Sequence, residues 1–551
     1  MIPWQTAFSL VPGIILFLYG IEHFSEEILA VAKGKFNRVL ATLTATPLKA
    51  AGLGALVTAI IQSSAATTVI TMGLVNGGVI SFVQSLGIII GSNVGTTITA
   101  QLVAFRLTSI GPVFILLGFI IGLVGKQYKF LGKPTFYFGL VFFSLSLLSG
   151  ALAPFQNDPE IIGLLSRFSS VPLALLAGYL FTVLVQSSSV TSGIVVVLAQ
   201  GGFITLPHAI LLIFGANIGS TATPILASTT MGLYARRSAV AHLLFNFGGV
   251  LLIMPFFSQF QSLVLLVGGT DAQHVANAHL FFNLITAILF LLFVRQFEHV
   301  VERVVPGKER EVLLKTKYLT GDLPEDNTES FDLIEKEIQR FFDITRELFS
   351  DSVRLLDRDS RDVRQKIAKL KALSVYLDDE IERALQKMSR RHLTERDAKK
   401  TVIFIRMSNL IVRLGDWAYD FAETSGRITP GDSSVLPDLK EDVRKTYRIF
   451  DRNMEVLRVP FPGMLPETRE DIKQNDILLR ENLNANYLRQ LGIITREDEV
   501  ADSIVIELLS IIENANGLVH VMRKLAEMYA ALHLDGHARD SVAIENGASG
   551  A

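Results

Sequence analysis

The sequence contains no cysteine among its 551 residues, and charged residues are scarce in its first part. The absence of cysteine excludes disulfides, thiolate metal sites and cysteine nucleophiles. Residues 1–295 hold only 12 Lys and Arg and 6 Asp and Glu, so most of the chain's 51 basic and 53 acidic residues lie in the remainder. The near-neutral total therefore hides two different segments in series, one apolar and one charged.

A nucleotide-binding loop is also missing. None of the four Gly-Lys pairs is followed by Ser or Thr, so there is no Walker A motif to bind ATP phosphates. We expect a protein that is not an enzyme, needs no cofactor and binds no nucleic acid. The first apolar run has no basic residues before it, so we interpret it as a retained membrane helix and not as a signal peptide.

Long apolar runs recur before residue 295, and a run of about 20 residues spans the roughly 30 Å hydrocarbon core of a bilayer. The charged remainder has apolar residues at helical spacing, which is typical of bundle helices. The predicted fold class is all-α: a polytopic membrane part followed by a soluble helical bundle.

A 36-residue stretch occurs twice, at residues 62–97 and 186–221. The copies align without a gap at an offset of 124 residues and agree at 14 of 36 positions. The shared residues are mostly polar or glycine: a Gln-Ser-Ser head, a Gly-Gly pair and a Gly-x-Asn-x-Gly tail. Duplicated core packing would retain apolar residues instead. The repeat therefore predicts one binding site made from two related halves.

Both copies interrupt apolar segments with polar residues. We expect residues 50–80 and 171–204 to form re-entrant hairpins with Gln-Ser-Ser at their tips, because each limb is too short to cross a bilayer. We expect residues 82–105 and 207–228 to form broken helices, the first unwound at residues 91–97. Such interruptions at matching places in two halves are typical of transporter sites.

The repeated residues supply hydroxyls, amides and opened backbone, but no Lys, Arg, Asp or Glu. Half-helix N-termini suit an oxyanion, and carbonyl or hydroxyl oxygens suit a hard cation such as sodium. An anion bound there needs a co-bound cation to offset its charge, which is the argument for symport. Isolated small polar motifs more often serve helix packing, but the recurrence at one offset favours a site.

At these residues the sequence resembles a known family. QSSAATT with GSNVGTT, and QSSSVTS with GANIGST, resemble the paired signature of the type II sodium/phosphate cotransporters over about residues 10–295. The resemblance implies sodium-coupled uptake of inorganic phosphate by alternating access of inverted repeats. It also implies location in the cytoplasmic (inner) membrane, with the C-terminal domain in the cytoplasm.

The resemblance implies a transmembrane domain at residues 1–306, with repeats at 10–125 and 134–235 and further helices to 295. Ser63, Ser64, Ser187 and Ser188 would hold phosphate oxygens. The full set of predicted substrate-binding residues is Gln62, Ser63, Ser64, Thr67, Asn93, Thr96, Thr97, Gln186, Ser187, Ser188, Ser189, Thr191, Asn217, Ser220 and Thr221. The co-transported sodium would be shared among Gln62, Ser64, Asn93, Thr97, Gln186, Ser188, Asn217 and Thr221.

The charged part is similar to the PhoU family. We expect a linker at residues 307–330, a PhoU-like domain at 331–535 with two three-helix halves (331–425 and 436–534), and a disordered tail at 536–551. PhoU proteins gather metal on a helix-face acid motif, but Val412 stands where the first acid belongs, so the resemblance leaves the metal content of this domain open. A regulatory protein or a second copy of the chain is the expected partner.

Other interpretations remain open. The substrate could be sulfate, another oxyanion or a small carboxylate, because no residue discriminates among them. A membrane sensor that binds phosphate without net transport is a further alternative. His242 and Asn246, and likewise His279 and Asn283, share a helix face at i and i+4. We interpret them as interhelical hydrogen bonding within a scaffold, with a proton relay as the alternative.

Overall fold

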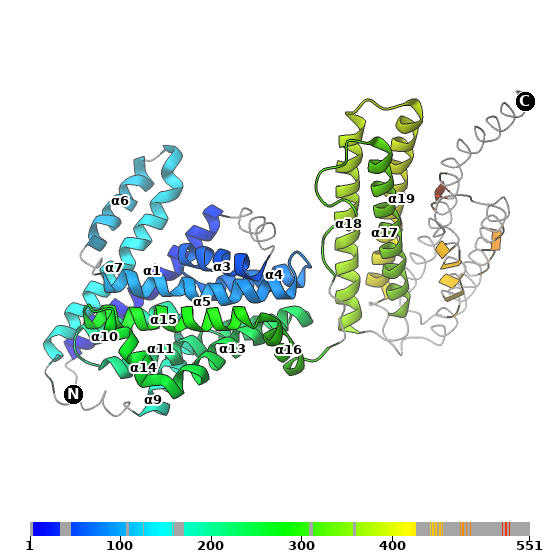
Figure 1. Cartoon of the computed structure of the whole chain (residues 1–551). Coiled ribbons are helices and arrows are strands. Elements are labelled where there is room, and N and C mark those ends of the chain that lie inside the picture. Colours follow the sequence, from blue (N-terminus) through cyan, green and yellow to red (C-terminus); the bar gives the residue numbers. More distant parts are fainter. Residues whose placement is uncertain are drawn as a thin grey trace, which may run out of the picture. The chain divides into compact units, whose positions relative to one another are not determined.

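The computed structural model describes most of the chain as far as residue 425. It covers residues 4–32, 46–105, 110–124, 126–156, 158, 170–307, 312–355 and 360–425, with scattered positions between 441 and 528. The chain divides into two compact units, residues 1–311 and 312–551. All secondary structure in these described ranges is helical (Figure 1). The predicted all-α class is confirmed.

Among the described residues of the first unit, five helical segments are long and apolar enough to cross a membrane. These are Phe82–Ala104, Tyr128–Phe155, Leu206–Ser228, Leu233–Leu266 and Asp271–Leu292. The unit also contains α1 (Trp4–Ala32), α6 (Gly111–Val124), α7 (Gly132–Leu152), α14 (Phe257–Leu266) and α16 (Val294–Val304). Short 3₁₀ turns occur at Lys126–Leu131, Ala153–Phe155 and Met254–Phe256.

Two helix pairs are interrupted at the Gln-Ser-Ser residues, as predicted. Helix α3 (Pro47–Ile61) is followed by α4 (Ser64–Asn76), and α9 (Val171–Val185) by α10 (Ser188–Gln200). Gln62 and Gln186 have φ angles of 62° and 58° and are the only non-glycine residues with positive φ in the described part of the chain. A left-handed residue ends a helix, so the chain changes direction at each glutamine. The membrane depth of these turns stays a prediction.

Helix α3 packs against α5 (Phe82–Ala104) with the two backbones in contact. A Cβ atom on Gly91 would lie 1.9 Å from the Ala51 carbonyl oxygen, and one on Gly54 would lie 2.2 Å from the Ile88 carbonyl oxygen. Glycine permits this approach because it has no side chain, as in membrane helix pairs with small-residue interfaces.

The same contacts recur at an offset of 124 residues between α9 and α11 (Leu206–Gly219). Added Cβ atoms on Gly215 and Gly178 would each lie 2.0 Å from a carbonyl oxygen, those of Leu175 and Leu212 respectively. The two copies of the motif therefore build the same helix pair twice.

The predicted unwinding at residues 91–97 is wrong, because α5 is continuous from Phe82 to Ala104. Its glycines serve close packing, and its hydroxyls bond to the helix's own carbonyls. Ser92 donates to the Ile89 oxygen at 2.8 Å, and Thr96 donates to the Ser92 oxygen at 3.0 Å. Polar residues therefore sit in this helix without opening it.

The second predicted break is present, between α11 and α12 (Ala222–Ser228), at Ser220 and Thr221. Proline has no N–H group and its ring clashes with the carbonyl four residues earlier, so Pro224 cannot continue a helix from Ser220. The corresponding residue in the first copy is Ala100, which α5 accommodates. A proline, rather than the glycines, separates the two halves.

Helices α13 (Leu233–Ile253) and α15 (Asp271–Leu292) carry the two His-Asn pairs. Helix α15 runs alongside α5 in Figure 1, and the residues on the facing sides are buried. These helices therefore pack against the motif-bearing helices and support them.

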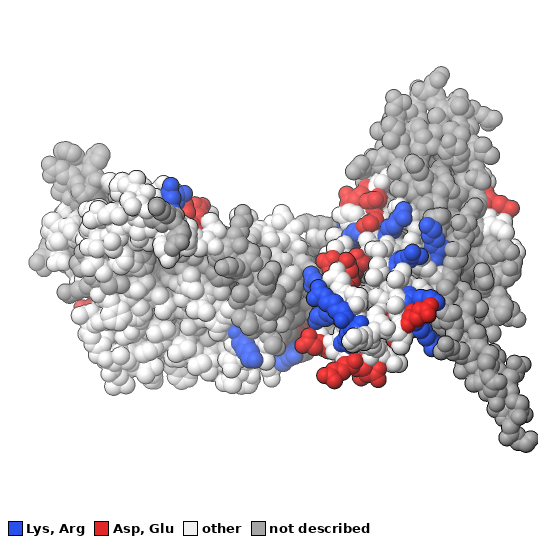
Figure 2. Space-filling view, turned by 90° about the horizontal axis from the view of Figure 1, so that it is seen from above, with Lys and Arg blue, Asp and Glu red and all other residues white. Residues whose placement is uncertain are grey.

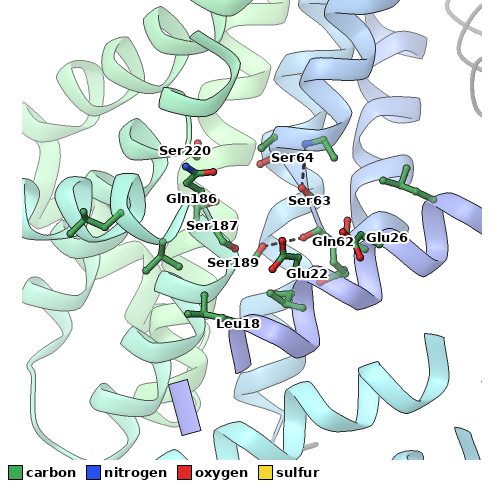
Figure 3. Close-up of a pocket in the computed structure, with 18 residues that line it drawn as sticks. Leu18, Glu22, Glu26, Gln62, Ser63, Ser64, Gln186, Ser187, Ser189 and Ser220 are labelled. Atoms are coloured by element: carbon green, nitrogen blue, oxygen red, sulfur yellow. Dashed lines mark hydrogen bonds between the residues drawn. The ribbon is translucent and has the colours of Figure 1, made fainter. Parts of the chain in front are cut away.

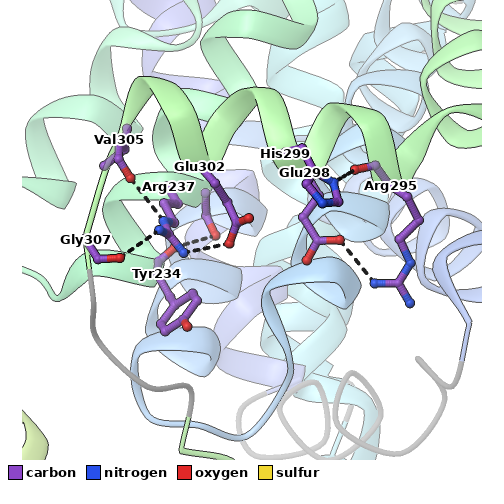
Figure 4. Close-up of polar contacts among 9 residues, drawn as sticks. Tyr234, Arg237, Arg295, Glu298, His299, Glu302, Val305 and Gly307 are labelled. Carbon is purple, nitrogen blue, oxygen red and sulfur yellow. Dashed lines mark hydrogen bonds and ion pairs between the residues drawn. The ribbon is translucent and has the colours of Figure 1, made fainter.

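Arg237 on α13 holds the end of α16. Its guanidinium group donates to Glu302 Oε1 at 3.0 Å, to the Val305 carbonyl at 3.2 Å and to the Gly307 carbonyl at 3.4 Å (Figure 4). The same group lies 5.2 Å from the centre of the Tyr234 ring. A cation at the C-terminus of α16 also complements the helix dipole.

The described part of the second unit contains three mutually packed helices: α17 (Asn327–Arg354), α18 (Arg361–Ser389) and α19 (Glu395–Ser425). Their core is apolar, with Phe341, Leu377 and Leu414 fully buried. Figure 2 shows mixed Lys, Arg, Asp and Glu on the visible face of this unit and few on that of the first unit. Asp416 on α19 pairs with Lys371 on α18.

No group of three or more His, Cys, Asp or Glu could hold a metal ion within the described ranges. The predicted second three-helix half, 436–534, falls mostly outside those ranges, and the predicted tail, 536–551, falls wholly outside them. The PhoU resemblance therefore stays a prediction.

Replacing Gly91 with Ala is expected to reduce stability sharply, because the new methyl group would overlap the Ala51 carbonyl and force α3 and α5 apart. The measurement is the yield and melting temperature of the monodisperse protein in detergent. Gly73→Ala is the control, since a Cβ there meets nothing within 4 Å and alanine favours a helix. Equal melting temperatures for the two variants would contradict the packing described.

Replacing Arg237 with Met is expected to cost about 1–3 kcal/mol of stability, because three acceptors lose a charged donor. The melting temperature should fall by several degrees. Arg236→Met removes the same charge from an exposed neighbouring residue and should leave it nearly unchanged. If both variants melt alike, Arg237 does not anchor α16.

Candidate functional site

A cavity of about 390 Å³ lies where the two Gln-Ser-Ser turns meet α1 (Figure 3). Eight of the predicted site residues line it, three from the first copy of the motif and five from the second. They are Gln62, Ser63, Ser64, Gln186, Ser187, Ser188, Ser189 and Ser220. Residues 124 positions apart in the sequence thus line the same cavity.

Two helices begin at the cavity wall. Ser63 and Ser187 are the N-caps of α4 and α10, and their hydroxyls accept from the N–H groups of Ala66 at 3.2 Å and Val190 at 3.3 Å. The first turn of a helix has N–H groups without an intrahelical partner, and the dipole makes this end partly positive. Two 13-residue helices therefore present anion-binding ends to one cavity.

The next serines, Ser64 and Ser188, keep their hydroxyls available. Both line the cavity, and only 5% and 6% of their surfaces are exposed. No hydrogen bond to another described residue engages either hydroxyl. Neither hydroxyl oxygen is among the described buried atoms that lack a partner, so both open into the cavity, where a ligand can reach them.

One hydrogen-bonded chain joins the two copies. The Thr99 hydroxyl donates to Gln62 Oε1 at 2.5 Å and lies 3.3 Å from Ser189 Oγ. Ser189 Oγ in turn lies 3.5 Å from the Gln62 carbonyl oxygen. The residue that corresponds to Ser189 in the first copy is Ala65, which has no hydroxyl. The link therefore forms once, and Gln62 is held more firmly than Gln186.

The predicted residues Thr67 and Thr191 lie beside the cavity and brace the turns. Thr67 Oγ1 and Thr58 Oγ1 are 2.9 Å apart, and Thr191 Oγ1 and Thr182 Oγ1 are 2.7 Å apart. Each pair joins the helix before a Gln-Ser-Ser turn to the helix after it. These threonines therefore stabilise the turns by joining the two helices of each hairpin.

The remaining predicted residues do not line the cavity. Asn93 Oδ1 lies 3.3 Å from His242 Nε2, and Asn217 Oδ1 lies 3.1 Å from His279 Nε2. Interhelical hydrogen bonds of the expected kind therefore tie both histidines to the repeated motif. Thr96, Thr97 and Thr221 are buried and donate to carbonyls of their own segments.

The sequence reasoning missed the residues of α1. Glu22, Ser25 and Glu26 line the cavity on the side of Gln62 (Figure 3). The available signal was a pair of acids four residues apart in a mostly apolar helix, a spacing that places both on one face. Ionisable residues in such a segment point to function.

The charge of the cavity is one-sided. Two carboxylates face it, whereas none of the described residues that line it is Lys or Arg. An isolated dianion is repelled by such a wall, but hydroxyl, amide and carboxylate oxygens together suit a hard cation. The site can accept an oxyanion at its helix N-termini only with cations present.

Comparison with known proteins identifies relatives of the first unit. A family model described as Na+/Pi-cotransporter matches residues 16–150 and 159–293. The uncharacterized protein YqeW of Bacillus subtilis is 32% identical over 266 residues, which is 48% of this chain and 86% of that protein.

More distant matches have functional names. The putative inorganic phosphate export protein YjbB of Escherichia coli is 31% identical over 257 residues, which is 46% of this chain and 47% of that protein. Human sodium-dependent phosphate transport protein 2B is 34% identical over 139 residues, 23% of this chain and 20% of that protein. No solved structure matches the chain.

Proposed function

Because the chain belongs to the Na+/Pi-cotransporter family and is a multi-pass membrane protein, we propose that it is a secondary active transporter that moves inorganic phosphate together with sodium ions. The observation that carries this proposal is the single cavity in which both Gln-Ser-Ser turns meet. A transporter needs one substrate site reached from either side, and a duplicated pair of interrupted helices provides it.

Phosphate suits the donors on the cavity wall. Its oxygens accept hydrogen bonds from the free hydroxyls of Ser64 and Ser188 and from first-turn N–H groups of α4 and α10. Helix dipoles add partial positive charge at the same places. Gln62 and Gln186 offer amide groups that both donate and accept, so they serve the anion or the cation.

Sodium explains how an anion binds without a basic residue. A cation bound beside phosphate offsets its charge, so each ion raises the affinity for the other. This coupling explains how a site without Lys or Arg can bind an anion: the anion and the sodium ion bind together. Sulfate or another oxyanion would meet the same donors, and competition against phosphate measures the preference.

The direction of transport depends on the gradients. A symporter runs inward when the sodium gradient exceeds the opposing phosphate gradient, and outward when the inequality is reversed. We propose sodium-driven uptake as the main direction. Export is the second candidate, because the name of the Escherichia coli relative refers to phosphate export.

We place the protein in the cytoplasmic membrane, with the second unit in the cytoplasm. The charged surface of that unit suits an aqueous compartment (Figure 2). Its proposed role is regulation through a partner protein or a second copy of the chain. Alternating access would arise from movement of the two duplicated halves, which are predicted to be inverted repeats, against α13 and α15.

The decisive test of the function is phosphate flux in proteoliposomes. Labelled phosphate should enter with an inward sodium gradient and should not enter when potassium replaces sodium. Preloaded vesicles with an outward sodium gradient should lose phosphate, which measures export on the same preparation. Sodium-independent binding without counterflow would support the sensor alternative.

Ser64→Ala and Ser188→Ala are each expected to weaken phosphate binding about 10- to 100-fold, since a hydrogen bond to a charged group contributes about 1.5–3 kcal/mol. The measurement is the phosphate concentration for half-maximal uptake at saturating sodium. Ser144→Ala is the matched control, because this buried serine donates to the Val141 carbonyl away from the cavity. Unchanged affinity in both cavity variants would remove these serines from the site.

A further inference from the structure

We infer that α1 supplies a sodium site in this cavity, in which Glu22 is the principal charged ligand and Glu26 assists it. The inference rests on the proposed function, because it assigns the coupling ion of the same cavity to named residues. Neither the repeated motif nor its signature contains these acids, which lie about 40 residues before the first Gln-Ser-Ser turn.

The acids face the cavity because of helix geometry. The residues of α1 that line the cavity include Leu18, Glu22, Ser25, Glu26 and Leu29, at spacings of three and four. With 3.6 residues per turn, these positions form one stripe along the helix. Figure 3 shows Glu22 and Glu26 projecting from α1 beside Gln62.

The neighbouring acid behaves differently. Glu27 lies outside the lining and pairs with Lys133, with 2.9 Å between Oε1 and Nζ. Glu22 has no Lys or Arg partner among the described residues, and Glu26 Oε2 lies 3.1 Å from His23 Nδ1. Three acids within six residues thus divide into one that is neutralised by the protein and two that face the cavity.

A second observation points to a ligand at the same place. Ser64 and Ser188 are more than nine-tenths buried, line the same cavity and have hydroxyls without a described partner. Carboxylate oxygens with hydroxyl oxygens are ligands that a hard cation prefers. A sodium ion in the cavity would be coordinated by these open hydroxyls and would offset the negative charge of Glu22.

The charge of the acids couples phosphate binding to sodium binding. Before a cation enters, the carboxylates repel a phosphate dianion from the cavity. After sodium binds at Glu22, the wall is less negative and the helix N-termini can attract the anion. Sodium at Glu22 therefore raises the affinity of the cavity for phosphate.

The experiment compares Glu22→Gln, Glu26→Gln and Glu27→Gln in the full-length protein. All three remove one negative charge from α1 within six residues, but only the first two remove it from the cavity. Two readouts are used: the sodium concentration for half-maximal phosphate uptake in proteoliposomes, and calorimetric titration of the purified protein with sodium chloride against choline chloride.

Glu22→Gln should raise the half-maximal sodium concentration at least tenfold and weaken sodium binding in the calorimeter by a similar factor. Glu26→Gln should shift both in the same direction by less, because His23 shares its carboxylate. Glu27→Gln should match the wild type. Glu22→Asp, which keeps the charge, should recover part of the affinity and guards against a folding defect in the amide variant.

Wild-type sodium dependence in Glu22→Gln would overturn the inference. So would a tighter phosphate affinity with unchanged sodium binding, since the carboxylates would then only repel the anion. Sodium binding that needs Glu22 in a protein without phosphate flux would refute the proposed transport and leave the sodium site standing. Flux coupled to sodium with no effect of Glu22 would do the reverse.

Discussion

The site depends on two glutamines held in a left-handed backbone conformation. Gln62 and Gln186 have positive φ, which costs an ordinary L-residue roughly 1–2 kcal/mol relative to the right-handed helix. This turn lets one helix end and another begin within two residues. Because the next residue is a serine N-cap, the turn also directs a helix N-terminus into the cavity. Without it, α3 and α4 would be one helix and the cavity would lose its donors.

The surrounding structure keeps that conformation in place. The Thr58–Thr67 and Thr182–Thr191 contacts tie the two limbs of each hairpin together. Behind them, Gly91 and Gly215 bring α5 and α11 into backbone contact with the first limb of each hairpin. Close-packed helices of this kind resist small adjustments. The polar site is thus held by contacts that are themselves mostly apolar or between backbones.

The sequence predicted those features of the fold that depend on local residue patterns. Gln-Ser-Ser in an apolar run predicted both interruptions, since polar residues there are costly unless they have a role. It failed at residues 91–97 because glycine permits both unwinding and close packing, and only the neighbouring helix decides between them. Pro224 was the better signal, since its effect on a helix needs no tertiary context. Glu22 and Glu26 were missed because they lie outside the repeat, and only the packed fold brings α1 to the cavity.

The difference between α5 and the α11–α12 pair has a mechanical consequence. Bending α5 in its middle would break backbone hydrogen bonds that cannot be replaced by water inside a bilayer. In the second half Pro224 has no N–H group to donate to the Ser220 carbonyl, so one such bond is already missing and a bend there costs less. The first copy therefore has a continuous helix that resists bending, whereas the corresponding helix of the second copy is interrupted and bends more easily. A single proline thus makes one of two related helices easier to bend than the other, and the bend point lies next to Ser220, which lines the cavity.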